Sequence, residues 1–295
     1  MEIPSAETPI QQDGFEIRDR VLIRCLTQDP RPSIPDTVTS IGPQAFRGCE
    51  FLKAITIPDT VTAIEPLAFC GCSQLEAVTF PSRLTVLGDS AFAGCRSLQS
   101  VRLPDTLSSM GCAVFSDCFA LKTVVLPEHL GWISGGVFRD CAALEEIRLP
   151  DSIRSIHSDS FYGCIGLETL ELPQKLNYIG ERAFGDCRKL KNLELPQSLG
   201  YIGYSAFADC TALTTVSFPE TPMTVGREVF QGCYALETIT GPMGSLLMED
   251  DLRSSGPSRR VAQWRREGRC QYCGGKFKGL FTQVCRVCGR EKDYD

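Results

Sequence analysis

The sequence predicts an α+β repeat fold, a solenoid of stacked coils in which each coil contributes short strands and a single helical turn. Three columns of recurring residues predict it. Cysteine recurs every 23 residues from Cys49 to Cys233, phenylalanine keeps the same interval three residues earlier, and leucine keeps it three residues later. Such a period is typical of repeat proteins, whose units bury their apolar faces only by stacking. We therefore expect like residues of successive coils to form ladders.

Each coil is expected to begin with a short strand, as the unit from Leu52 to Cys72 illustrates. Apolar and polar residues alternate in LKAITIP, so Ile55 and Ile57 should point inward and their neighbours outward. Pro58 lacks a backbone donor and ends the strand, and Pro-Asp-Thr is typical of a tight turn. VTAI then predicts a second short extended segment.

A helical turn is expected to close each coil. The segment PLAFCGC, which ends at Cys72, would bury Ala68 and Phe69 on that turn. The residue before every repeat cysteine is Gly or Asp, and both types tolerate a left-handed conformation. That conformation would end the turn and direct the cysteine back into the core.

The repeat cysteines are predicted to be packing residues. Stacked strands lie about 4.8 Å apart, within disulfide range for the Cα atoms, but their side chains point in parallel rather than toward each other. Their number, nine, is odd, and a free buried cysteine behaves as a small apolar side chain with a weak donor. We therefore expect no redox or metal role for this column, and so many free thiols favour a reducing compartment.

The unit Leu-x-x-Ile-x-Ile-Pro-x-x-Val-x-x-Ile-x-x-x-Ala-Phe-x-x-Cys resembles the BspA-like, or Treponema-type, leucine-rich repeats. The resemblance covers about residues 34–242. FEIRDRVLIRC, from Phe15 to Cys25, resembles the hairpin that often opens such arrays, with Asp19-Arg20 where Asp-Gly is usual. The resemblance implies a curved solenoid used mainly for binding and implies no enzymatic activity. The partners of this family are too varied to transfer to the chain.

Composition favours a soluble protein, with 43% apolar and 22% charged residues. The N-terminus lacks the basic and apolar regions of a secretory signal, and no apolar run is long enough to span a membrane. We therefore expect a cytoplasmic protein with no membrane partner, and the resemblance to BspA-like repeats favours a bacterial one.

Charge is divided unevenly along the chain, which indicates two parts. Residues 253–295 hold 11 Lys and Arg against 4 Asp and Glu, whereas the remainder holds 19 against 32. Between them, MEDDLRSSGPSRR breaks both the period and the hydrophobicity, as a linker does. The predicted parts are an N-terminal segment with a capping hairpin (1–33), the solenoid with its terminal cap (34–252), a linker (253–262), and a basic helix with a small ribbon (263–295).

Four cysteines of the C-terminal part fall outside the repeat register: Cys270, Cys273, Cys285 and Cys288. They form two Cys-x-x-Cys-Gly turns separated by eleven residues. Four thiolates complete a tetrahedral shell and leave no open position, so the pattern predicts one structural Zn²⁺ in a zinc ribbon. Iron, which also accepts four thiolates, and disulfides are the alternatives. A module this small would take its stability from the metal.

A basic helix is predicted directly before this ribbon, in RRVAQWRREGR. Its arginines are Arg259, Arg260, Arg265, Arg266 and Arg269. They could bind nucleic acid or an acidic protein face. The alternative is a solvated helix whose Trp264 packs on the ribbon or on the last coil.

Catalytic motifs are absent from the sequence. His129 and His157 fall in different registers, and no phosphate loop, G-x-S-x-G or H-E-x-x-H pattern occurs. Outward strand positions hold the carboxylates Glu146, Glu171 and Glu194, which are typical of a solvated acidic face. We expect no enzyme.

Partner-binding residues are predicted at outward positions. Trp132, Tyr178 and Tyr201 share one column, and Arg102 and Arg148 share a strand column that is otherwise mostly small and polar. Interface hot spots favour these three residue types. The alternative is that the aromatic residues only cover their neighbours.

These features together predict a non-catalytic scaffold. The solenoid would mediate protein–protein interaction, and the zinc ribbon would be a structural appendage. The alternative is a nucleic-acid-associated factor that binds through the basic tail and the ribbon.

Overall fold

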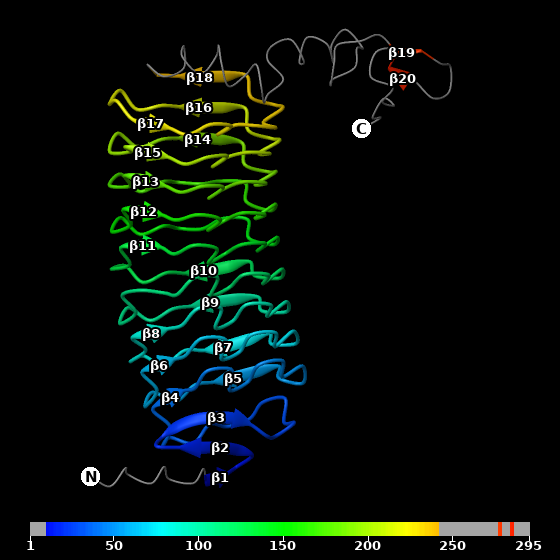
Figure 1. Cartoon of the computed structure of the whole chain (residues 1–295), viewed down its shortest axis with the longest axis vertical. Coiled ribbons are helices and arrows are strands. Elements are labelled where there is room, and N and C mark those ends of the chain that lie inside the picture. Colours follow the sequence, from blue (N-terminus) through cyan, green and yellow to red (C-terminus); the bar gives the residue numbers. More distant parts are fainter. Residues whose placement is uncertain (1–9, 242–276, 279–283, 286–295) are drawn as a thin grey trace, which may run out of the picture.

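The computed structural model describes residues 10–241, 277–278 and 284–285. The chain winds into a solenoid of about ten coils with a period near 23 residues, and the coils stack along one axis (Figure 1). The solenoid and its period are confirmed. Within the described residues no helix occurs, so none could cross a membrane.

The predicted hairpin opens the array. β2 (Phe15–Arg18) pairs antiparallel with β3 (Val21–Cys25), and β1 (Ile10–Gln12) adds a third antiparallel strand. The turn residues Asp19 and Arg20 have φ of 49° and 65°. Two positive φ values are what a tight hairpin turn requires, which is why Gly is usual there. β3 then pairs in parallel with β4 (Ser40–Ile41), which joins the hairpin to the first coil of the solenoid.

Two columns of short parallel strands run along the solenoid (Figure 1). The first column holds the strands that precede the proline turn: β5 (Ala54–Thr56), β7 (Ala77–Thr79), β9 (Ser100–Arg102), β10 (Thr123–Val125), β14 (Asn192–Glu194), β16 (Thr215–Ser217) and β18 (Thr238–Thr240). The second column holds the strands that follow it: β4, β6 (Ala63–Ile64), β8 (Val86–Leu87), β11 (Trp132–Ile133), β12 (Ser155–Ile156), β13 (Tyr178–Ile179), β15 (Tyr201–Ile202) and β17 (Thr224–Val225).

Pairing along both columns joins residues 23 apart, as in Ala54↔Ala77 and Tyr178↔Tyr201. Each column has a break. The first is interrupted between β10 and β14, and the second between β8 and β11. Separately, β19 (Phe277–Lys278) pairs antiparallel with β20 (Val284–Cys285).

The predicted core ladders are present. Ile55 and Ile57 are 3% and 2% exposed, whereas Thr56 between them is exposed. The phenylalanine rings from Phe46 to Phe230 stack coil on coil, with 4.6 to 5.9 Å between the centroids of neighbouring rings. One continuous apolar core therefore runs through the array, because each coil covers the next.

The predicted helical turn is wrong, and the α+β class with it: the described residues form a β-solenoid. In the segment that ends at Cys72, alternate amides go to different partners. The N–H groups of Ala68 and Cys70 donate within the coil, to residues three positions earlier. Those of Phe69 and Gly71 donate to Ala91 and Ala93 of the next coil, at 2.7 Å each. Half of the N–H groups that a helix would need therefore form hydrogen bonds with the next coil instead.

The predicted left-handed conformation before each repeat cysteine is confirmed, and it also excludes a helix. The Gly or Asp before every repeat cysteine has a positive φ, from 57° at Asp140 to 75° at Gly71 and Gly232. A second residue four positions earlier, such as Leu67, is left-handed as well. Two left-handed residues within five break the regular right-handed dihedrals of an α-helix.

Substitution of Gly94 tests this requirement. Its φ is 74°, and an added Cβ would meet its nearest atom, the Cα of Gly71, at an ordinary 3.6 Å. We therefore expect Gly94→Ala to lower the free energy of unfolding by about 1 kcal/mol through backbone strain. Gly94→Asn should cost less, since Asn tolerates this conformation. Urea denaturation of both variants measures the difference, and equal costs would contradict the strain argument.

Candidate functional site

A row of side chains crosses four adjacent strands of the second column, and we call it the aromatic row: Trp132, Ser155, Tyr178 and Tyr201. The parallel register places Trp132 beside Ser155, Ser155 beside Tyr178, and Tyr178 beside Tyr201. The three aromatic side chains are 42%, 38% and 37% exposed. Each precedes a buried isoleucine, so strand alternation turns the isoleucine inward and the ring outward.

The rings of the aromatic row are ordered by their neighbours. Tyr178 and Tyr201 stack with centroids 5.1 Å apart and planes 7° apart. The His157 ring lies edge-on to Tyr178 at 6.1 Å, and its Nε2 is 3.3 Å from the Ser155 hydroxyl. Stacking covers one face of each tyrosine, and the rest of each exposed ring remains for a partner. The short side chain of Ser155 lies between the larger side chains of Trp132 and Tyr178.

The structure does not bring the five predicted partner-binding residues together. Arg102 lies on β9, and Arg148 lies two coils further along the same column, whereas the aromatic row belongs to the other column. Arg148 forms an ion pair with Glu128, and this carboxylate raises the pKa of the guanidinium. The predicted partner-binding residues therefore lie on two separate surfaces, one on each strand column.

Sequence reasoning missed a groove at the break in the first strand column. There, residues 146–148 and 169–171 form no strand and share one bridge, Arg148↔Glu171. A groove of 750 Å³ opens over this break, and its charged lining residues are Lys122, Glu146, Arg148, Asp151, Glu171 and Glu194. The signal was present in the sequence: Glu171 and Glu194 occupy equivalent positions of adjacent coils, and like charges placed side by side weaken strand pairing.

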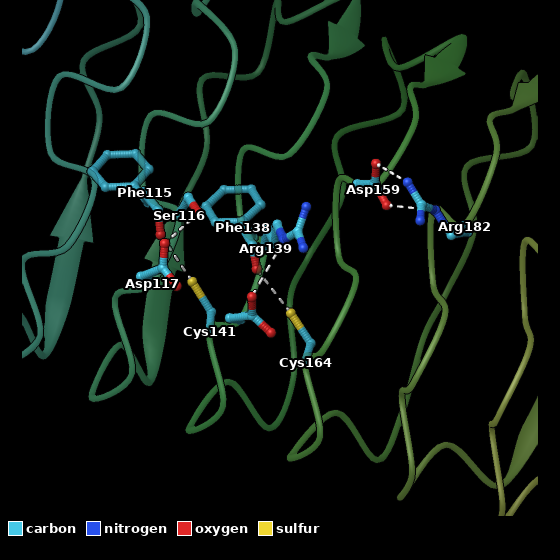
Figure 2. A network of polar contacts seen from close by, with 10 residues as sticks. Phe115, Ser116, Asp117, Phe138, Arg139, Cys141, Asp159, Cys164 and Arg182 are labelled. Atoms are coloured by element: carbon cyan, nitrogen blue, oxygen red, sulfur yellow. Dashed lines mark hydrogen bonds and ion pairs between the residues drawn. The ribbon is translucent and has the colours of Figure 1, made fainter.

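Eight of the nine repeat cysteines are fully buried packing residues, as predicted. From Cys72 to Cys233 each thiol donates to the carbonyl oxygen of the phenylalanine 26 residues earlier, at 3.0 to 3.3 Å. Figure 2 shows two of these bonds, from Cys141 to Phe115 and from Cys164 to Phe138. Burial raises the pKa of Cys118 to about 12, so these thiols are poor nucleophiles. The twelve cysteines between Cys25 and Cys233 form no disulfide.

Polar pairs border this cysteine ladder at the surface. Arg182 pairs with Asp159 at 3.0 Å, and the Ser116 hydroxyl donates to Asp117 at 2.9 Å (Figure 2). Three of these side chains, Ser116, Asp117 and Asp159, line an open hollow of about 610 Å³. Among the described residues no group of three or more His, Cys, Asp or Glu could hold a metal ion.

Three of the four predicted metal ligands and all five tail arginines lie outside the described residues. Cys270, Cys273 and Cys288 lie outside the described residues, as do Arg259, Arg260, Arg265, Arg266 and Arg269. Of the four cysteines only Cys285 is placed, as the last residue of β20, opposite Phe277. The zinc ribbon and the basic helix therefore stay predictions.

Comparison with known proteins identifies the repeat. The model of the BspA type leucine rich repeat region matches residues 17–145 and 132–249, in six copies. No curated protein matches the chain.

Solved structures show the same fold. A leucine-rich repeat protein from Bacteroides ovatus is 28% identical with a TM-score of 0.62, over 79% of this chain and 68% of that one. The leucine rich repeat protein of T. pallidum is 34% identical with a TM-score of 0.56, over 58% and 82%. A leucine rich cell surface protein from Faecalibacterium prausnitzii is 23% identical with a TM-score of 0.59, over 80% and 77%, which shows the fold alone.

The family model spans well over half of the sequence, and its 23-residue unit is the coil seen in the structure. Leucine-rich repeat proteins are generally protein-interaction scaffolds. The chain belongs to the BspA-type leucine-rich repeat family.

Proposed function

We propose that this chain is a non-catalytic scaffold that binds a protein partner through the aromatic row. The observation that carries the proposal is the unbroken register of Trp132, Ser155, Tyr178 and Tyr201, whose rings are exposed and partly stacked. By contrast, the exposed side chains Phe119, Ile165 and Tyr234 share another column but are separated there by Ala142, Arg188 and Thr211.

The chemistry of the row favours a protein partner. Tyr and Trp supply large contact areas at low conformational cost, and protein interfaces are enriched in both. The ordered Tyr178–Tyr201 pair reduces the entropy lost on binding, because its rings are already held. Arg102 and Arg148 are proposed as a second, separate contact on the first strand column.

The remaining predictions complete the proposal. We place the protein in the cytoplasm and assign the C-terminal cysteines to a structural zinc ribbon. Nucleic-acid binding by the tail arginines is the alternative function, and the described residues contain no feature that favours it over protein binding.

The triple variant Trp132→Ser, Tyr178→Ser, Tyr201→Ser tests the proposal. We expect wild-type protein, immobilised and exposed to native lysate, to capture a specific partner near one-to-one stoichiometry. The triple variant should lose at least 90% of that capture, because each truncated hot spot costs about 2 kcal/mol or more. Quantitative mass spectrometry of the captured proteins gives the measurement.

The matched control is Phe119→Ser, Ile165→Ser, Tyr234→Ser. These side chains are 42%, 39% and 44% exposed, so the control removes as many exposed apolar groups from another column. It should retain wild-type capture. Equal capture by the wild type and the aromatic-row variant would exclude the row as the binding site.

A further inference from the structure

The groove at the break in the first strand column is large enough for a ligand. Its volume of 750 Å³ falls within the range of ligand pockets, and its lining comes from four successive coils, from Lys122 to Glu194. Coils stack about 4.8 Å apart, so the groove extends about 14 Å, roughly the length of four or five extended residues. It lies on the other strand column from the aromatic row, which makes it a separate surface.

Backbone groups at this groove lack partners that they have elsewhere in the column. β10 pairs with β9 and β14 pairs with β16, and no described strand pairs with the two edges that face the break (Figure 1). In the paired part of the column the N–H of Leu103 donates to Val125 at 3.0 Å. The described residues have no such backbone bond from Leu126 to Arg148 in the next coil. Unpaired backbone groups at a strand edge can bond to another extended chain.

The floor of the groove is apolar. Three inward side chains at the break line it and are 6 to 8% exposed: Val124, Ile147 and Leu170. Their equivalents in the paired coils on either side, Val101 and Leu193, are 2% exposed. Neighbouring coils therefore cover the floor less completely at the break, and it offers a bound chain an apolar surface.

The charge of the groove is negative and largely uncompensated. Four carboxylates line it: Glu146, Asp151, Glu171 and Glu194. The cations of the lining are Lys122 and Arg148, and Arg148 is already paired with Glu128. Among the described residues none of the four lining carboxylates forms an ion pair. The groove therefore complements a cationic ligand and repels an acidic one.

We propose that this groove binds an extended, basic segment of a partner protein. Side chains of an extended chain alternate between its two faces, so basic residues are expected at every second position of the segment. Their aliphatic stems lie on the apolar floor while the charged groups reach Glu146, Glu171 and Glu194 at the rim. The backbone of the segment bonds to the open strand edges.

Titration of the full chain with a labelled peptide tests the proposal. We expect fluorescein-labelled KTKTKTK to bind with one-to-one saturation, measured by fluorescence anisotropy, and the neutral counterpart QTQTQTQ not to bind. The double variant Glu171→Gln, Glu194→Gln should weaken binding of KTKTKTK about tenfold, because two charge contacts are lost. Both glutamates are exposed, so the variant should keep the circular dichroism spectrum of the wild type.

The matched control is Glu50→Gln, Glu76→Gln, which removes the same charge from exposed positions of other coils. It should bind KTKTKTK as the wild type does. Equal weakening by the control and the groove variant would show general attraction to an acidic body and overturn the proposal. Binding of QTQTQTQ as tight as that of KTKTKTK would overturn it as well.

The aromatic-row variant separates this proposal from the proposed function. Trp132→Ser, Tyr178→Ser, Tyr201→Ser should bind KTKTKTK normally, because the row lies on the other strand column. Loss of peptide binding in that variant would place the peptide on the row instead of in the groove. Failure of the peptide to bind at all would overturn the groove proposal and leave the aromatic row untouched.

Carbodiimide cross-linking locates the bound peptide. The reagent joins a lysine amine to a carboxylate as an amide and is itself converted to a urea. Mass spectrometry of the digested product should find the amide bonds at Glu146, Glu171 or Glu194. Cross-links confined to carboxylates outside the groove would contradict the assignment.

Discussion

Replacing Phe161 by alanine is expected to lower the free energy of unfolding by about 4 kcal/mol. Phe161 is fully buried, and its ring stacks between Phe138 at 5.3 Å and Phe184 at 5.1 Å. Its backbone N–H donates to the carbonyl oxygen of Ala183 at 2.7 Å, so a hydrogen bond holds the coil against its neighbour. The neighbouring rings therefore cannot move in to fill the void, and the full cavity cost remains.

Urea denaturation followed by circular dichroism measures this loss. The control is Phe119→Ala, whose side chain is 42% exposed and lies under the guanidinium of Arg96 at 5.6 Å. Loss of such an exposed cation–π contact should cost about 0.5–1 kcal/mol. If Phe161→Ala cost no more than Phe119→Ala, the phenylalanine ladder would not be a principal source of stability.

Much of this fold could be predicted from the sequence because the contacts repeat with the chain. In a solenoid each residue meets its equivalent in the next coil, so the interval of 23 residues is also the register of the sheet, as in Tyr178↔Tyr201. The same argument located the aromatic row. Strand alternation placed Ile55 inside and Thr56 outside without any knowledge of long-range contacts.

The errors came from contacts that a single unit does not contain. PLAFCGC has the composition of a helical turn, but the amides of Phe69 and Gly71 bond to the next coil and are lost to a helix. The break near Glu171 lies between coils that carry charged residues at equivalent positions, Arg148, Glu171 and Glu194.

Metal removal gives the other large expected effect. We expect the full chain to bind one Zn²⁺, held by Cys270, Cys273, Cys285 and Cys288, because four thiolates with this spacing satisfy tetrahedral zinc. The antiparallel pairing of β19 with β20 places Cys285 opposite Phe277, which is compatible with such a site. The double variant Cys285→Ser, Cys288→Ser should lose the zinc entirely.

Elemental analysis of dialysed protein gives the zinc content, with Cys70→Ser, Cys112→Ser as a control that removes two cysteines outside both the ladder and the quartet. Zinc that is present in the wild type and in this control but absent from the Cys285→Ser, Cys288→Ser variant would trace to the C-terminal quartet. Chelation should leave the main unfolding transition in place, since the ladders that stabilise the solenoid contain no ligand set. One equivalent of iron in place of zinc, or zinc retained by the Cys285→Ser, Cys288→Ser variant, would contradict the assignment.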